Sequence, residues 1–173
     1  MTTAPDLARR IAEVATVHGD FLLRSGDRAT TYFDKYQFES APDLLVDIAD
    51  ALAPLIPDGT ELLAGLELGG VPLATALSIA TGIPAVFVRK EAKTYGTAKL
   101  AEGPAIVHRN LLVVEDVVTS GGQIVASTTD LRSQGATVEH AVCVIDREAG
   151  GAAALAAAGI TLHPLFTRSD LER

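Results

Sequence analysis

The chain has 173 residues, of which 48% are hydrophobic, and its formal net charge at pH 7 is −8. This length fits one domain, residues 1–173, with a substantial core, and without a long apolar run the chain is not expected to span a membrane. The acidic balance argues against a general nucleic-acid binder. The four histidines and the single cysteine, Cys143, show no zinc-ligand spacing, and one cysteine leaves no internal disulfide, as is typical of a cytoplasmic protein.

The N-terminal region predicts a helix followed by a hairpin. Apolar side chains recur at helical spacing over residues 5–17, and Gly19 is a good helix terminator. The runs 21–24 and 29–33 flank a glycine-containing turn, which is typical of a hairpin. We expect this hairpin to form a flap, about residues 19–40, over the ends of the strands that follow.

From residue 34 onward, helices alternate with apolar strands. Residues 34–39 combine aromatic and charged side chains, and their pattern alone favours an amphipathic cover over the core. Ser40 is the expected cap of the next helix, with Pro42 in its first turn. The alternation indicates an α/β fold, a mainly parallel sheet of right-handed βαβ units flanked by helices. The predicted strands span 61–66, 84–88, 111–114, 138–145 and 160–166, and the predicted helices span 42–55, 72–81, 123–134 and 151–158.

The segment 89–99 reverses the charge of the chain as a whole. It carries four cations and one anion and shows no apolar periodicity. A charged loop is by default a solvated face of the protein. The reversed sign favours instead a mobile arm, about residues 89–104, that meets a polyanion.

The stretch 111–123 combines a strand, two acids and a turn. Its four apolar residues, 111–114, are typical of a fully buried parallel strand, and Glu115 and Asp116 follow where that strand is expected to leave the sheet. The small residues 119–122 then open a helix, which offers backbone N–H groups and a helix dipole to a phosphate. Acids beside a phosphate suit sugar hydroxyls or a metal ion, so a phosphorylated ribose is the favoured ligand. Each piece alone is more often a solvated acid or an ordinary turn.

A second strand–glycine–helix junction lies at residues 67–72, where Gly69 and Gly70 precede Pro72. Such a junction can bind an anion through its backbone N–H groups. By itself it is as often only a tight turn of a βα unit.

The stretch 111–123 resembles the phosphoribosyl-diphosphate (PRPP) signature of the type I phosphoribosyltransferases. Together with Tyr32-Phe33-Asp34, Arg89-Lys90-Glu91-Ala92-Lys93 and Asp146-Arg147, it makes the chain similar to the orotate phosphoribosyltransferases over most of its length, from about residue 19 to residue 167. The resemblance implies a type I phosphoribosyltransferase fold with a small N-terminal hood. It also implies transfer of a phosphoribosyl group from PRPP to orotate, which gives orotidine 5′-monophosphate and diphosphate in pyrimidine (UMP) biosynthesis.

The resemblance assigns the strand–turn junctions to PRPP. Glu115 and Asp116 are expected to hold the ribose hydroxyls and to stabilise developing positive charge. Lys93, expected to be the most rate-sensitive cation, completes the catalytic set. The full set assigned to PRPP is Arg24, Leu68, Gly69, Arg89, Lys90, Lys93, Tyr95, Glu115, Asp116, Val117, Val118, Thr119, Ser120, Gly121, Gly122 and Gln123.

The resemblance assigns orotate to Arg147, whose planar guanidinium suits a carboxylate, together with Thr119, Tyr32 and Phe33. Without the resemblance, Arg147 is better interpreted as a strand-end arginine paired with a nearby carboxylate such as Glu148.

Cofactor and partners also follow from the resemblance. Mg²⁺ is the expected cofactor, held mainly by PRPP rather than by protein ligands. The expected partners are PRPP, orotate and a second copy of the chain, in a homodimer whose loop 89–99 reaches across the interface. Neither a nucleic acid nor a membrane is expected.

Two positions depart from the family pattern. Gly69 stands where many relatives carry a lysine, and Tyr95 stands where many carry a histidine. Two alternatives remain open at this point, since a fold does not fix a function. One is a phosphoribosyltransferase for another base, and the other is a non-catalytic regulator that senses PRPP.

Overall fold

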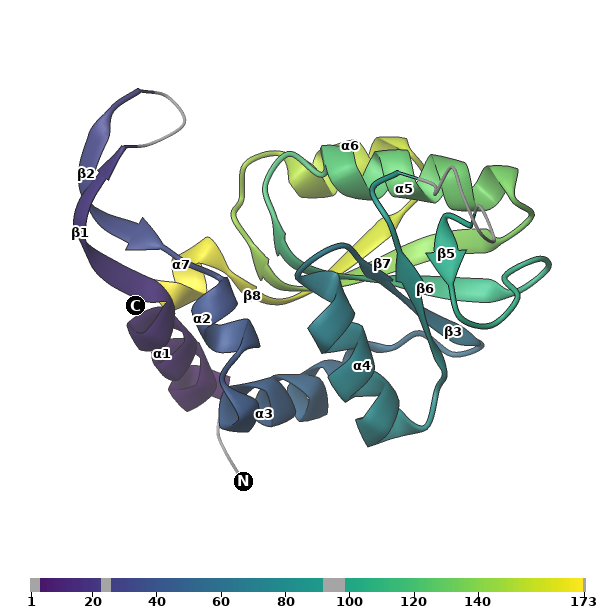
Figure 1. Cartoon of the computed structure of the whole chain (residues 1–173), viewed down its shortest axis with the longest axis horizontal. Helices are drawn as coiled ribbons and strands as arrows, with labels where there is room; N and C mark the ends of the chain where they lie inside the picture. Colours follow the sequence, from purple (N-terminus) through teal and green to yellow (C-terminus); the bar gives the residue numbers. More distant parts are fainter. Residues whose placement is uncertain (1–3, 23–25, 92–98, 173) are drawn as a thin grey trace.

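The computed structural model describes residues 4–22, 26–91 and 99–172. At its centre is a six-stranded sheet of order β5-β4-β3-β6-β7-β8, in which each neighbouring pair is parallel except β4 and β5 (Figure 1). This sheet confirms the predicted α/β fold class. Its strands are β3 (Leu62–Leu66), β4 (Ala85–Val88), β5 (Ala101–Glu102), β6 (Asn110–Val118), β7 (Thr137–Asp146) and β8 (Thr161–Thr167).

Helices cover both faces of the sheet. In Figure 1, α3 and α4 lie on one side with α1 and α2, and α5 and α6 lie on the other. Among the described residues, no helix is long and apolar enough to cross a membrane. The helices are α1 (Ala4–Ala15), α2 (Tyr36–Glu39), α3 (Pro42–Leu52) with the 3₁₀ turn η1 (Ala53–Leu55), α4 (Gly70–Thr81), α5 (Gly122–Ser133), α6 (Gly151–Ala157) and α7 (Arg168–Leu171).

The central strand β6 is buried on both faces, as its apolar run predicts. Leu112 and Val114 pack with the side chains of α1, α3 and α4, whereas Leu111 and Val113 pack with those of α5 and α6. This division follows the two-residue period of a strand. The two hydrophobic cores therefore meet at β6 and fix its position in the sheet.

The N-terminal hairpin forms a separate two-stranded antiparallel sheet of β1 (Thr16–Leu22) and β2 (Arg28–Phe33), which confirms the predicted hairpin. Its first arm starts earlier than predicted, because α1 ends at Ala15 and the β-branched Thr16 enters the strand. In Figure 1 the hairpin projects away from the main sheet. Its base, where Thr16 pairs with Phe33, stays beside α1.

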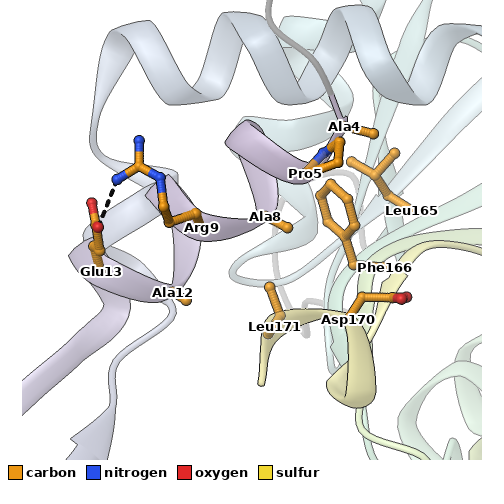
Figure 2. A pocket seen from close by; sticks show the side chains of 10 residues that line it. All are labelled: Ala4, Pro5, Ala8, Arg9, Ala12, Glu13, Leu165, Phe166, Asp170 and Leu171. Carbon is orange, nitrogen blue, oxygen red and sulfur yellow. Dashed lines mark hydrogen bonds and ion pairs between the residues drawn. The ribbon is translucent and has the colours of Figure 1, made fainter. Parts of the chain in front are cut away.

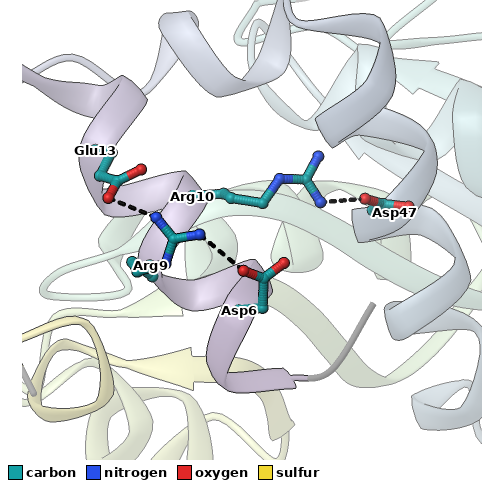
Figure 3. Close-up of polar contacts among 5 residues, drawn as sticks. All are labelled: Asp6, Arg9, Arg10, Glu13 and Asp47. Carbon is teal, nitrogen blue, oxygen red and sulfur yellow. Dashed lines mark hydrogen bonds and ion pairs between the residues drawn. The ribbon is translucent and has the colours of Figure 1, made fainter. Parts of the chain in front are cut away.

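An ion pair ties α1 to the body of the protein. Arg10 Nη1 lies 2.5 Å from Asp47 Oδ2 of α3, and both side chains are half-buried (Figure 3). Arg9 instead pairs with Asp6 and Glu13 within α1 itself, at the surface. Exposed pairs within one helix contribute little to stability. The half-buried Arg10–Asp47 pair, in contrast, links α1 to α3.

An apolar cavity of about 640 Å³ lies between α1 and the C-terminal β8–α7 segment (Figure 2). Ala8, Phe166 and Leu171 are among its lining residues. Of the described side chains assigned to PRPP or orotate, none lines this cavity.

The predicted end of the central strand is wrong by four residues. We expected the strand to leave the sheet after Val114, but β6 continues to Val118 because β7 pairs with it along this extension. Pairing with β3 on the other side stops at Val114. Glu115 and Asp116 therefore lie inside a strand, at a point where only one neighbour remains.

The predicted cap of α3 is also wrong. The N-cap is Ala41, not Ser40, and Pro42 takes the first helical position. The Ser40 hydroxyl donates to the Gln37 carbonyl oxygen instead. Ser40 therefore closes the preceding short helix α2 rather than opening α3.

We predict that Leu112→Ala lowers the free energy of unfolding by about 2–5 kcal/mol, because Leu112 is 1% exposed and its truncation leaves a cavity in the core. Leu22→Ala is the matched control, since Leu22 is 74% exposed, and we expect a change within about 0.5 kcal/mol. Urea unfolding followed by circular dichroism measures both. Equal losses in the two variants would contradict the placement of β6 at the core.

Candidate active site

The candidate site is built around two acids in the extension of β6. Asp116 is fully buried and Glu115 is 8% exposed. Since β3 ends before them and β7 continues beside them, they lie at the carboxyl edge of the sheet, where ligands of parallel sheets bind. The structure thus places the predicted acids at the predicted edge, although deeper in the protein than a strand exit implies.

Lys35, which precedes α2, pairs with the deeper acid. Its Nζ atom lies 2.6 Å from Asp116 Oδ2. Burial acts to lower the pKa of Lys35, but the hydrogen bond to Asp116 outweighs it and raises the pKa. Burial likewise acts to raise the pKa of Asp116, and hydrogen bonds from Glu39, Glu115 and Lys35 overcome it and lower the pKa. Asp116 is therefore the ionised member of the group.

The pKa values of the other two carboxyl groups are raised, which favours their neutral forms at pH 7. Burial, reinforced by the nearby Asp116 carboxylate, raises the pKa of Glu39 to about 9. The same two causes raise the pKa of Glu115 to about 8. A neutral carboxyl donates a hydrogen bond, so these groups stabilise the Asp116 carboxylate instead of repelling it. Neither Lys35 nor Glu39 was singled out from the sequence; the only signal was the density of charged and aromatic residues in 34–39.

The turn between β3 and α4 packs directly on these acids. A Cβ atom at Gly69 would overlap the carboxyl groups of Asp116 and Glu39, so only glycine fits. Gly69 is buried, and Leu68 beside it is 60% exposed. The second strand–glycine–helix junction, residues 67–72, therefore packs against the acids at Gly69, which contributes only backbone atoms there.

The predicted phosphate loop follows β6 at the same edge. Val117 and Val118 complete the strand, Thr119 and Ser120 are exposed, and Gly121 adopts a left-handed conformation with φ of 76°. A Cβ at Gly121 would overlap Leu155 of α6, so the turn is held close to that helix.

Helix α5 starts at Gly122 immediately after this turn, and no side chain caps it. The first N–H groups of a helix have no acceptor within the helix, and here they lie where the dipole is positive. Gln123, in the first turn, donates to Ser127 at 3.1 Å rather than back to the helix start. The N-terminus of α5 is thus available to an anion.

The described part of the charged segment joins the β3–α4 turn. The Lys90 backbone N–H donates to Glu67 Oε2 at 3.0 Å, and Arg89 Nε lies 3.4 Å from Glu102 of β5. These contacts bring Arg89 and Lys90 to the same edge as Gly69. Lys93 and Tyr95, like Arg24 of the hairpin, lie outside the described residues.

The residues assigned to orotate gather in one pocket. Tyr32, Phe33 and Arg147 line a cavity of about 220 Å³, together with Arg168 of α7. The Arg147 guanidinium carbon lies 5.6 Å from the centre of the Phe33 ring. The Arg147 backbone N–H donates to the Val118 carbonyl at 2.9 Å, which places it beside the phosphate loop that contains Thr119.

Glu148 is not the partner that a strand-end Arg147 would take. The Glu148 carboxylate accepts hydrogen bonds from the backbone N–H and the hydroxyl of Ser169, the second residue of α7. Among the described residues, Arg147 forms no ion pair, so its guanidinium charge is left for a ligand.

Comparison with known proteins identifies relatives over the whole chain. The phosphoribosyl transferase domain family matches residues 36–158. An orotate phosphoribosyltransferase from Nocardioides sp. is 50% identical over 172 residues, 99% of this chain and 96% of that protein.

Solved structures agree in fold. The orotate phosphoribosyltransferase of Mycobacterium tuberculosis in complex with Fe(III) dicitrate superposes with a TM-score of 0.89 at 31% identity, covering 98% of this chain and 99% of the other. The same enzyme in complex with PRPP superposes with a TM-score of 0.84 at 28% identity and the same coverage. Sequence and fold together show that the chain belongs to the orotate phosphoribosyltransferase family.

Proposed function

We propose that this protein transfers the 5-phosphoribosyl group of PRPP to orotate, giving orotidine 5′-monophosphate and diphosphate in pyrimidine biosynthesis. The observation that carries the proposal is the pair of buried acids, Glu115 and Asp116, directly before the uncapped N-terminus of α5. Acids for the ribose hydroxyls are followed, after the end of β6 and the loop 119–121, by a helix N-terminus for the 5′-phosphate, and a phosphorylated ribose carries both kinds of group.

The proposed reaction needs no protein nucleophile. The bond from ribose carbon 1 to diphosphate breaks, diphosphate leaves with the electron pair, and a ring nitrogen of orotate forms the new bond. Positive charge develops on the ribose, and we assign its stabilisation to Asp116, whose lowered pKa keeps it ionised at neutral pH. We assign diphosphate to Leu68, Gly69, Arg89 and Lys90, with Lys93 as the most rate-sensitive cation.

We infer that Mg²⁺ is the cofactor and is held mainly by oxygen atoms of PRPP. This ion commonly binds through one or two carboxylates together with substrate phosphates. We assign Glu115 and Asp116 to the ribose hydroxyls, so the ion takes its oxygen ligands mainly from PRPP. When bound, it neutralises charge on the leaving diphosphate, while the protein residues hold and orient the sugar.

We also infer that two copies of this single-domain chain, residues 1–173, form a homodimer in the cytoplasm, with loop 89–99 reaching the neighbouring site. An apolar groove of about 480 Å³ between α3 and α4 supports the dimer. It is lined by Val46 and Ile79, which are 58% and 82% exposed. Exposed apolar patches of this kind mark protein interfaces. The free, buried thiol of Cys143 suits a reducing compartment.

The base-specificity assay tests the proposed function. With PRPP and Mg²⁺, we expect the purified protein to consume orotate, followed by its absorbance, and to leave uracil unchanged, because uracil would leave the Arg147 charge unpaired. Consumption of a purine instead would indicate a transferase for another base. Binding of PRPP with no base consumed would favour the regulator.

Arg147→Ala should raise the KM for orotate at least tenfold and change the KM for PRPP by less than threefold, since we assign Arg147 to the orotate carboxylate. The matched control is Arg168→Ala: Arg168 lines the same pocket but pairs with Glu172. Steady-state kinetics with each substrate varied in turn measures both. A larger effect of Arg168→Ala, or a larger change in the KM for PRPP, would refute the assignment.

The dimer is tested by Ile79→Asp, which places a charge in the α3–α4 groove. We expect the wild-type protein to have twice the 18.0 kDa chain mass by light scattering, and Ile79→Asp to shift it toward the monomer. Val107→Asp is the control, because Val107 is also exposed, at 53%, but lies outside the groove. A dimer unaffected by Ile79→Asp would place the interface elsewhere.

A further inference from the structure

The contact between Lys35 and Asp116 joins two segments that the substrate assignments above treat separately. Lys35 follows the base-pocket residues Tyr32 and Phe33 in sequence, yet its ammonium group pairs with the acid assigned to the ribose. Phe33 meanwhile contacts the Arg147 guanidinium. A few residues of one segment therefore touch both proposed substrate sites.

Glu39 completes the arrangement from the far end of α2. Its side chain is 6% exposed, and its Oε1 atom is buried without a hydrogen-bond partner among the described residues. That atom faces the space above Gly69, the same space that Asp116 Oδ2 faces. A proton shared between the Glu39 and Asp116 carboxyl groups provides a hydrogen bond to both. Two ionised carboxylates buried side by side would instead repel each other.

The net charge of Lys35, Glu39 and Asp116 affects how strongly an anion such as PRPP binds beside them. Asp116 with Lys35 is a neutral pair, and a protonated Glu39 adds no charge. Loss of the Lys35 ammonium would leave a buried, uncompensated carboxylate beside the positions assigned to the phosphate and diphosphate of PRPP. Gly69 has no side chain that could replace the missing cation.

We propose that Lys35 and Glu39 are positioning residues for PRPP, which hold the buried Asp116 carboxylate in place at the edge assigned to the ribose and keep the site free of excess negative charge. The proposal rests on the proposed function, in that Asp116 is taken to bind the sugar. Lys35 fixes the carboxylate from the flap side, and Glu39 fixes it from the side of the Gly69 turn. Lys35 is the N-cap of α2 and lies two residues after Phe33, the last residue of β2, so one short segment contacts both the base pocket and Asp116.

Lys35→Met removes the ammonium group and keeps most of the side-chain volume. We expect it to raise the KM for PRPP at least tenfold with less than a threefold change in the KM for orotate, and Lys35→Arg to recover most of the affinity. Arg9→Gln is the control, because it removes one surface cation far from the acids. A KM for PRPP within twofold of wild type in Lys35→Met, or no recovery in Lys35→Arg, would overturn the role of Lys35.

Glu39→Gln tests the role of Glu39, because glutamine is neutral and has nearly the same shape. This test remains valid even if Lys35→Met fails to fold. The ionisable groups that act on Glu39 are Asp116, Lys35 and Glu115, which wild type and Glu39→Gln share. From the β3–α4 turn, Gly69 faces this group, and Glu67 accepts a hydrogen bond from the Lys90 N–H. Since the pKa of Glu39 is about 9, wild-type Glu39 gains negative charge above that pH and glutamine does not. We expect PRPP affinity to fall more steeply from pH 8 to pH 10 in the wild type than in Glu39→Gln, by at least threefold. Identical pH profiles would contradict the role of Glu39.

Calorimetric binding of PRPP without orotate separates this proposal from the proposed function. If the wild type binds PRPP but uses no orotate, the proposed function fails, and the positioning role is still decided by the binding of the Lys35 and Glu39 variants. If the wild type uses orotate and the variants bind PRPP as it does, only the positioning role fails.

Discussion

The buried carboxylate of Asp116 is the constraint on which the arrangement of this site depends. Moving a carboxylate out of water costs several kcal/mol unless ion pairs and hydrogen bonds compensate. Here compensation comes from three side chains: Lys35 and Glu39, at the two ends of α2, and the adjacent Glu115 in β6. The turn at Gly69 must carry no side chain, because one would occupy the space of these groups. This one buried charge thus accounts for a cation at the start of α2, a carboxyl group at its end and a glycine in the β3–α4 turn.

The position of that carboxylate follows from unequal strand lengths. Strand β3 stops pairing at Val114 while β7 continues to Val118, so the acids lose one neighbour but stay in the sheet. The chain then turns at Gly121 and enters α5 with its first N–H groups unsatisfied. The buried acids, the uncapped start of α5 and Arg147, which forms no ion pair among the described residues, therefore lie at the ends of the adjacent parallel strands β6 and β7. This is the general location of ligand sites in such sheets.

Much of this architecture was predictable from the sequence, because each long element carries its own periodic pattern. The run 111–114, the helix starting near residue 123 and the N-terminal hairpin are confirmed, as is the family. β5, with two residues, and α7, with four, are too short to show a pattern. The extension of β6 through Glu115 and Asp116 was missed because acids inside a strand contradict its apolar pattern. Only pairing with β7 reveals it. Lys35 and Glu39 could not be found either, since no sequence spacing tells which distant charge meets a buried acid. The assigned roles of the site residues stay predictions.

The most direct test of this site is a crystal structure of the protein with ribose 5-phosphate or orotidine 5′-monophosphate bound. We expect the ribose hydroxyls within hydrogen-bond distance of Glu115 and Asp116, and the 5′-phosphate at the N-terminus of α5 over residues 119–122. Lys35 should remain in contact with Asp116. A sugar phosphate bound at another part of the chain, with Asp116 still enclosed by Lys35 and Glu39 and touching no hydroxyl, would contradict the central claim.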